Sequence, residues 1–129
     1  MLYPEYHKFI NLIKCYEKAH VMNICIIYTT FPDLESAKKA SEELFNERLI
    51  ACCNLFPTTI SMYVWDNELK VNNEVIMISK STHDNFTDIE RIILDNHPYD
   101  TPCIIEIPVS TGYMPFAQWI TASVAQAHI

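Results

Sequence analysis

Ligand-capable side chains are concentrated in one short stretch of the chain, DNHPYDTPCIIEIP at positions 95–108. At its centre His97, Tyr99, Asp100 and Cys103 surround two prolines, Pro98 and Pro102. Imidazole and thiolate are good ligands for copper or zinc, and carboxylates join them readily. The stretch therefore predicts either a metal site on His97 and Cys103 or a stiff bend between a helix and a strand, since Pro98 disfavours helical geometry at His97.

The composition is that of a small globular domain, and it argues against several classes of partner. The chain has 129 residues, 50% of them hydrophobic, and a formal net charge of −7. Such an acidic chain is a poor partner for nucleic acid or an anionic membrane. No apolar stretch reaches the roughly 18 residues of a membrane-spanning helix. The single glycine, Gly112, argues against a nucleotide cofactor, because phosphate-binding loops need several glycines.

The cysteines and the N-terminal sequence bear on the compartment in which the protein works. There are five cysteines, an odd number, and no CxxC pair, so the spacing fits neither a disulfide framework nor a zinc knuckle. The first residues, MLYPEYHKFINLIK, carry charged side chains where a signal peptide has its apolar segment. We therefore expect a protein of a reducing compartment.

Hydrophobic periodicity predicts strands and helices along most of the chain. Strands are expected where β-branched and aromatic residues are concentrated, over 22–31, 50–56 and 103–109. Apolar side chains at helical spacing predict helices over 33–48, 82–96 and 115–126. The second strand is expected to end near Pro57.

A long β-hairpin is predicted over residues 59–81. Its first arm alternates between two faces, with Ile60, Met62 and Val64 on one and Ser61, Tyr63 and Trp65 on the other. Asp66 and Asn67 supply turn chemistry between the arms. The run VIMI at 75–78 is apolar on both faces, as a central strand would be.

The order βαββαβ with an extra C-terminal helix predicts an α+β, ferredoxin-like sandwich. The last helix is expected to turn a set of apolar residues inward: Phe116, Trp119, Ile120 and Val124. After Glu106 the chain contains no Lys, Arg, Asp or Glu. An uncharged tail on an acidic domain predicts either a buried subunit interface or a helix that caps its own sheet.

Residues 1–21 stand apart from this pattern. Their apolar side chains form one helical stripe: Tyr6, Phe9, Ile10, Ile13 and Tyr16. We expect an N-terminal helical arm that docks on the core, followed by a single ferredoxin-like domain over 22–129.

Five ordered stretches resemble the divalent-cation tolerance family, the CutA family. They are TTFPD at 29–33, ERLIACCNLFP at 47–57, SMYVWDNELKVNNEVIMISKS at 61–81, HPYDTPCIIEIPV at 97–109 and YMPFAQW at 113–119. Together they span about residues 23–124. Each motif alone is weak, but five in the right order make the resemblance specific.

The resemblance implies a CutA-type domain assembled as a homotrimer, with the hairpin reaching across to a neighbour. It also implies binding of copper or another divalent metal, a cytosolic location and no established enzymatic reaction. We therefore expect a trimeric cytoplasmic metal-tolerance protein that is not an enzyme.

The metal ligands of the family transfer only in part. Copper binding in the family has been placed on a cysteine of the TT turn, a histidine before the HPY histidine and an acid after the second proline. The corresponding residues here are Thr29, Asn96 and Cys103. Cys103 is itself a soft ligand. The expected metal site therefore consists of His97 and Cys103, and the alternative is that Cys103 is a buried strand residue.

Further family positions predict a cleft between subunits, formed by Tyr63, Trp65, Glu74, Lys80, His97 and Tyr99. Glu74 beside a lysine and an imidazole would make an acid–base or anion-binding set. Two other functions follow: a small-molecule sensor or signalling trimer, and an enzyme acting on a small anionic metabolite. A structural interpretation is equally open, in which an ion pair and aromatic packing pin the hairpin to its neighbour.

Overall fold

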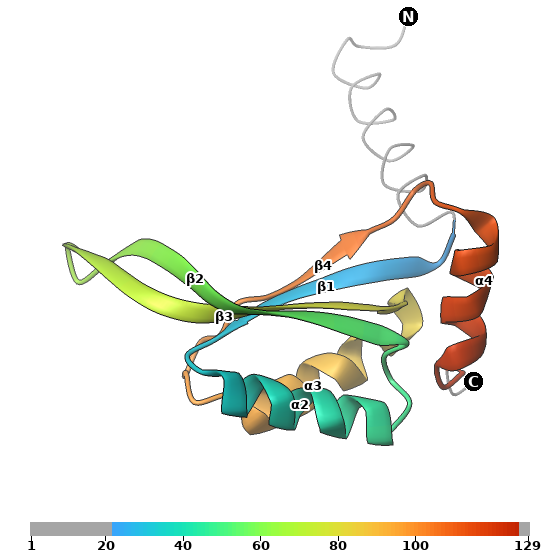
Figure 1. Ribbon diagram of the computed structural model, residues 1–129, viewed down its shortest axis with the longest axis horizontal. Helices are drawn as coiled ribbons and strands as arrows, with labels where there is room; N and C mark the ends of the chain where they lie inside the picture. The colour runs from blue at the N-terminus through green and yellow to red at the C-terminus, as the bar shows by residue number, and fades with distance from the viewer. Residues whose placement is uncertain (1–21, 127–129) are drawn as a thin grey trace, which may run out of the picture.

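A four-stranded antiparallel sheet forms the centre of the computed structural model, which describes residues 22–126 (Figure 1). The elements are β1 (Ile24–Phe31), α2 (Leu34–Asn46), β2 (Cys52–Trp65), β3 (Glu68–Thr82), the 3-10 turn η1 (His83–Asn85), α3 (Phe86–Asn96), β4 (Ile104–Pro108) and α4 (Met114–Ser123). The strand order across the sheet is β2-β3-β1-β4. The predicted α+β, ferredoxin-like fold is confirmed. The predicted arm, residues 1–21, lies outside the described residues.

Helices α2 and α3 cover one face of the sheet and bury the core beneath them (Figure 1). The fully buried side chains of this core include Ile27, Phe31, Leu44, Met77, Ile89 and Ile93. Asp33 caps α2, because its Oδ1 accepts a hydrogen bond of 2.7 Å from the backbone N–H of Ser36. Within the described residues, no helix is long and apolar enough to cross a membrane.

Strand β2 does not end near Pro57, as the sequence predicted, but continues to Trp65 as the first arm of the hairpin. Proline has no N–H to give to the strand ladder, so a strand tolerates it at a bulge. The pairing of β2 with β3 accordingly shifts register between Phe56 and Thr59. At the tip, Asp66 and Asn67 both have positive φ, 51° and 62°, as a tight two-residue hairpin turn requires.

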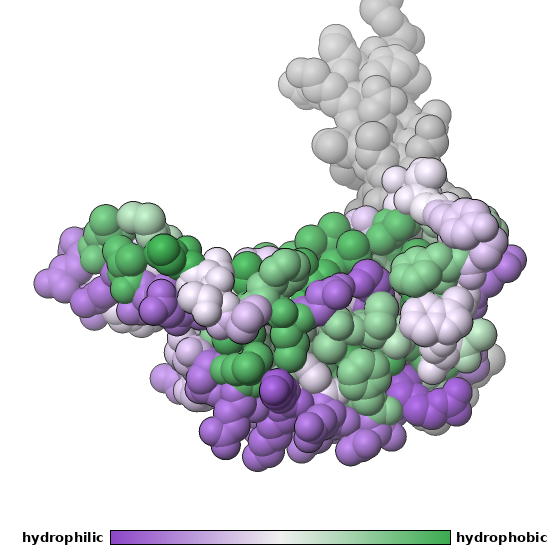
Figure 2. Space-filling model, viewed as in Figure 1, coloured by the Kyte–Doolittle hydropathy of each residue, from purple (hydrophilic) through white to green (hydrophobic). Residues whose placement is uncertain are grey.

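The face of the sheet away from α2 and α3 is apolar and partly exposed. On the edge strand, Ile105 is 51% exposed opposite Tyr28, and Ile107 is 45% exposed opposite Ile26. Figure 2 shows hydrophobic residues along the sheet and on one side of the hairpin, and hydrophilic residues over α2 and α3. The hairpin adds exposed residues from its apolar face: Ile60, Met62, Val64, Leu69 and Val71. Apolar surface of this extent is typical of an interaction site.

Helix α4 lies at the end of the sheet opposite the hairpin (Figure 1). Its Ile120 and the following Val124 are buried, as predicted. The prediction was wrong for Phe116 and Trp119, which are 43% and 47% exposed and stack on each other with ring centroids 5.6 Å apart. Only a narrow stripe of the helix, built on Ala117 and Ile120, packs against the sheet, so its aromatic side stays exposed to solvent.

Candidate functional site

A cleft of about 690 Å³ lies between the hairpin and the bend that follows α3. The hairpin supplies one wall and the bend supplies the other. The lining residues are Tyr63, Trp65, Lys70, Asn72, Glu74, Pro98, Tyr99, Asp100, Thr101 and Cys103. The cleft therefore unites the end of the HPY stretch with the aromatic face of the hairpin.

Strand alternation places the hairpin residues on this wall. Tyr63 pairs with Lys70 across the hairpin, and side chains of paired residues point to the same face. Counting by two along β3 brings Asn72 and Glu74 to that face as well. The Asn72 amide donates a hydrogen bond to the Tyr63 hydroxyl, and Lys70 Nζ lies 3.0 Å from Glu68 Oε2.

Glu74 is the buried charge of the cleft, with only 8% of its surface exposed. The Tyr99 hydroxyl donates a hydrogen bond of 3.2 Å to Glu74 Oε2. Burial raises the pKa of Tyr99 to about 12, and the negative charge of Glu74 adds to the effect. Tyr99 is therefore a neutral donor at physiological pH, which fits its position on a carboxylate.

His97 holds the bend to the end of β1. Its Nε2 lies 2.6 Å from the carbonyl oxygen of Thr30, which can only accept, so this nitrogen carries the hydrogen. Its Nδ1 accepts a 3.1 Å hydrogen bond from the backbone N–H of Tyr99. The ring also stacks on the buried Phe31, with centroids 4.7 Å apart. Both ring nitrogens are thus engaged, and their contacts position Tyr99 over Glu74.

Cys103 is the thiol of the cleft. It lies just before β4 and is partly buried. Burial raises the pKa of the Cys103 thiol, and the nearby charge of Glu74 raises it further. The thiol is therefore protonated at neutral pH, and a metal ion that binds it must displace the proton.

Three other predicted positions lie away from the cleft lining. Lys80 follows Glu74 by three alternations along β3, and its Nζ bonds Asn54 Oδ1 at 2.8 Å. Thr29 is fully buried in the core. Asn96 bonds the Glu43 carboxylate on α2 at 2.8 Å. Among the described residues, no group of three or more His, Cys, Asp or Glu side chains is placed to hold a metal ion.

Several cleft residues were not predicted from the sequence. Lys70 and Asn72 could have been found by alternation, because a turn at Asp66 and Asn67 pairs them with Tyr63 and Ser61. Asp100 and Thr101 carry no such signal. Their position depends on how His97 fixes the bend, and the partner in that contact is a backbone carbonyl 67 residues away.

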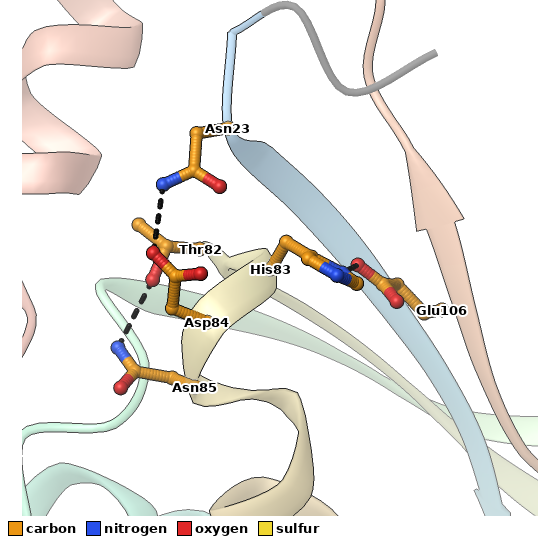
Figure 3. A network of polar contacts seen from close by, with 6 residues as sticks. All are labelled: Asn23, Thr82, His83, Asp84, Asn85 and Glu106. Carbon is orange, nitrogen blue, oxygen red and sulfur yellow. Dashed lines mark hydrogen bonds and ion pairs between the residues drawn. The ribbon is translucent and has the colours of Figure 1, made fainter. Parts of the chain in front are cut away.

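A second polar network lies at the other end of the sheet (Figure 3). His83 Nδ1 lies 2.6 Å from Glu106 Oε1, which ties η1 to β4. The Asn23 amide donates to Asp84 Oδ2 at 3.1 Å, which ties η1 to the start of β1. Within η1 the buried Asn85 bonds the Thr82 hydroxyl at 3.1 Å and the carbonyl of Ala125 at 2.9 Å. These hydrogen bonds join separate segments of the chain, so the network has a structural role.

The chain is similar to one known protein family over nearly all of its described residues. The family profile described as CutA1 divalent ion tolerance protein matches residues 25–123. The divalent-cation tolerance protein CutA of Pyrococcus horikoshii is 40% identical over 95 residues, which are 74% of this chain and 92% of that protein.

Two solved structures extend the likeness to the fold. The crystal structure of the divalent ion tolerance protein CutA1 from Ehrlichia chaffeensis has a TM-score of 0.76 and 39% identity, covering 81% of this chain and 97% of that one. The structure of the periplasmic divalent cation tolerance protein CutA from Archaeoglobus fulgidus has a TM-score of 0.76 and 32% identity, covering 79% and 99%. The hairpin, the cleft and α4 all lie within residues 25–123, which the family profile matches.

Proposed function

This chain belongs to the CutA1 divalent ion tolerance family, and we propose that it serves metal tolerance by binding copper or another divalent metal in the hairpin cleft. The observation that carries the proposal is the meeting of Glu74 and Cys103 in one cleft. A carboxylate and a thiolate are ligands that copper and zinc both accept. We propose further that the protein does this without catalysing a reaction.

The side chains of Glu74 and Cys103 are of types that bind metal ions, but the described residues of one chain do not complete a set of three such ligands. Within the described part of the chain, Glu74 receives one hydrogen bond, from Tyr99, so carboxylate lone pairs are left for a cation. Cys103 adds a soft sulfur. His97, the other ligand predicted from the sequence, must first release the Thr30 carbonyl or the Tyr99 amide. We therefore assign the leading roles to Cys103 and Glu74, with His97 as a third ligand that requires rearrangement.

Metal titrations of the full chain test this assignment. Calorimetry with Cu(II), Cu(I) and Zn(II) should show binding that weakens about tenfold or more in Cys103→Ser and in Glu74→Gln. Binding should tighten as the pH rises, because the raised pKa of Cys103 makes the metal compete with a proton. The pH dependence should be reduced in Cys103→Ser.

Cys52→Ser provides the matched control, since Cys52 is a partly buried strand thiol that does not line the cleft. This control should bind metal as the wild type does. The assignment fails if the wild type binds none of the three ions, or if Cys103→Ser and Glu74→Gln bind as tightly as Cys52→Ser.

We propose a homotrimer as the working assembly. Three exposed apolar surfaces support this proposal: the outer face of the sheet, the apolar side of the hairpin, and the pair of Phe116 and Trp119. They agree with the subunit interface expected from the uncharged C-terminal segment. A cytosolic location is supported by the unpaired thiols of the described residues, Cys25, Cys52, Cys53 and Cys103. Cell fractionation tests the location, which the name of the Archaeoglobus relative puts in the periplasm for that protein.

The cleft also favours a second candidate function, a small-molecule sensor or signalling trimer. Its supporting observation is the combination of a buried carboxylate with three aromatic residues in one cavity. An enzyme acting on an anionic metabolite has less support, because Lys80, its expected cation, bonds Asn54 outside the cleft.

A further inference from the structure

The charged groups that line the cleft make it electronegative. Glu74 and Asp100 are carboxylates, and Lys70 is the one basic side chain among the lining residues. The charge of Lys70 is partly balanced by Glu68, 3.0 Å away. Glu74 acts across the cleft on the bend, since its charge raises the pKa of Tyr99 and of Cys103. An anion entering the cleft is repelled by this field, and a cation is attracted.

The buried carboxylate of Glu74 has few hydrogen-bond donors to replace the water it has lost. It is 8% exposed, and the described residues offer it the single neutral donor of Tyr99. A buried carboxylate is costly unless hydrogen bonds or an opposite charge compensate the lost hydration. A ligand with several N–H donors and a positive charge supplies both.

Three aromatic side chains also line the cleft. Tyr63, Trp65 and Tyr99 line it and are 41%, 62% and 40% exposed. The faces of such rings attract cations, and their apolar area packs against carbon chains. The combination of aromatic walls and a recessed carboxylate suits a cation that carries a hydrocarbon body, and a bare metal ion makes no use of the rings.

We propose that this cleft binds a small organic ammonium ion. Its N–H groups bond the Glu74 carboxylate, and its hydrocarbon part lies against Trp65 and Tyr63. The ligand class is the primary alkylammonium, an amine metabolite in its protonated form. The proposal does not depend on the metal assignment, because it rests on the rings and Glu74 and makes no use of Cys103.

Three probes of similar size and different charge test the proposal on the full chain. Ligand-observed NMR titrations with n-butylammonium, n-butanol and butyrate should show the ammonium binding about tenfold more tightly than the alcohol, and butyrate the most weakly. Glu74→Gln keeps the shape of the side chain and should abolish the difference between ammonium and alcohol. Trp65→Leu keeps apolar bulk without the ring and should weaken ammonium binding about fivefold.

Matched controls separate the site from general effects. Phe45→Leu removes an exposed aromatic ring on α2, outside the cleft, and Glu42→Gln removes an exposed carboxylate on the same helix. Both should bind the ammonium as the wild type does. Light scattering on each variant verifies that the assembly is unchanged, so that a change in binding reports on the cleft alone.

The outcomes distinguish this proposal from the metal assignment. Cys103→Ser should weaken metal binding and leave ammonium binding unchanged, whereas Trp65→Leu should weaken ammonium binding and leave metal binding unchanged. The ammonium proposal is overturned if the wild type binds no probe, if butanol binds as tightly as butylammonium, or if butyrate binds best. Ammonium binding that survives without any metal binding would remove the metal assignment alone.

Discussion

Replacing His97 by alanine should lower the free energy of unfolding by about 3 kcal/mol. The side chain makes two hydrogen bonds, to the Thr30 carbonyl at 2.6 Å and from the Tyr99 N–H at 3.1 Å. It also covers Phe31, which is fully buried, and its removal opens a cavity beside that ring. Urea unfolding at one fixed protomer concentration measures the change, since an oligomer's stability depends on concentration.

Tyr99→Phe is the companion variant that measures how much of this effect passes through the cleft. It removes only the hydroxyl that bonds Glu74 and leaves the ring in place. We expect a loss of about 1 kcal/mol, because Glu74 then stays buried without its donor.

A chelator separates the structural role of His97 from a role as metal ligand. The loss of stability in His97→Ala should persist with chelator present, because both partners of the imidazole belong to the protein. A variant as stable as the wild type in chelator, yet unable to bind metal, would show that His97 acts as a ligand and that its contacts contribute little.

The local chemistry of the chain was enough to predict its elements and their order. The turn at Asp66 and Asn67 and the alternation of the first hairpin arm are written into neighbouring residues, and both were confirmed. The continuation of β2 past Pro57 was missed because it depends on pairing with β3, which tolerates a bulge there. Sequence preference alone stops a strand at proline.

Long-range packing decides what local patterns cannot. The periodicity of α4 marks Phe116 and Ile120 alike as apolar, and only the placement of the helix at the sheet end separates exposed from buried. The same reasoning applies to the candidate site. The family resemblance predicted that Tyr63, Trp65, Glu74 and Tyr99 share a cleft, and all four line the cleft of the structure. No sequence pattern, however, indicates that the imidazole of His97 bonds the Thr30 carbonyl.

Ile107→Glu should convert the proposed trimer into a monomer. Ile107 lies on the edge strand β4, 45% exposed on the apolar sheet face and opposite Ile26. In a symmetric assembly each protomer carries the same change, so three unpaired carboxylates would have to be buried at equivalent positions. The cost of several kcal/mol per buried charge exceeds what the interface can compensate. Light scattering should give three times 15.0 kDa for the wild type and 15.0 kDa for the variant.

Leu94→Glu is the control for this experiment. Leu94 is 48% exposed on α3, in the layer whose outer surface is hydrophilic in Figure 2, so the same chemical change there should leave the mass at the trimer value. Circular dichroism should show that both variants are folded. A wild type that runs as a monomer contradicts the trimer itself. If Leu94→Glu dissociates and Ile107→Glu stays a trimer, the interface lies on the helical side of the molecule, because the carboxylate at position 94 is then the one that would be buried.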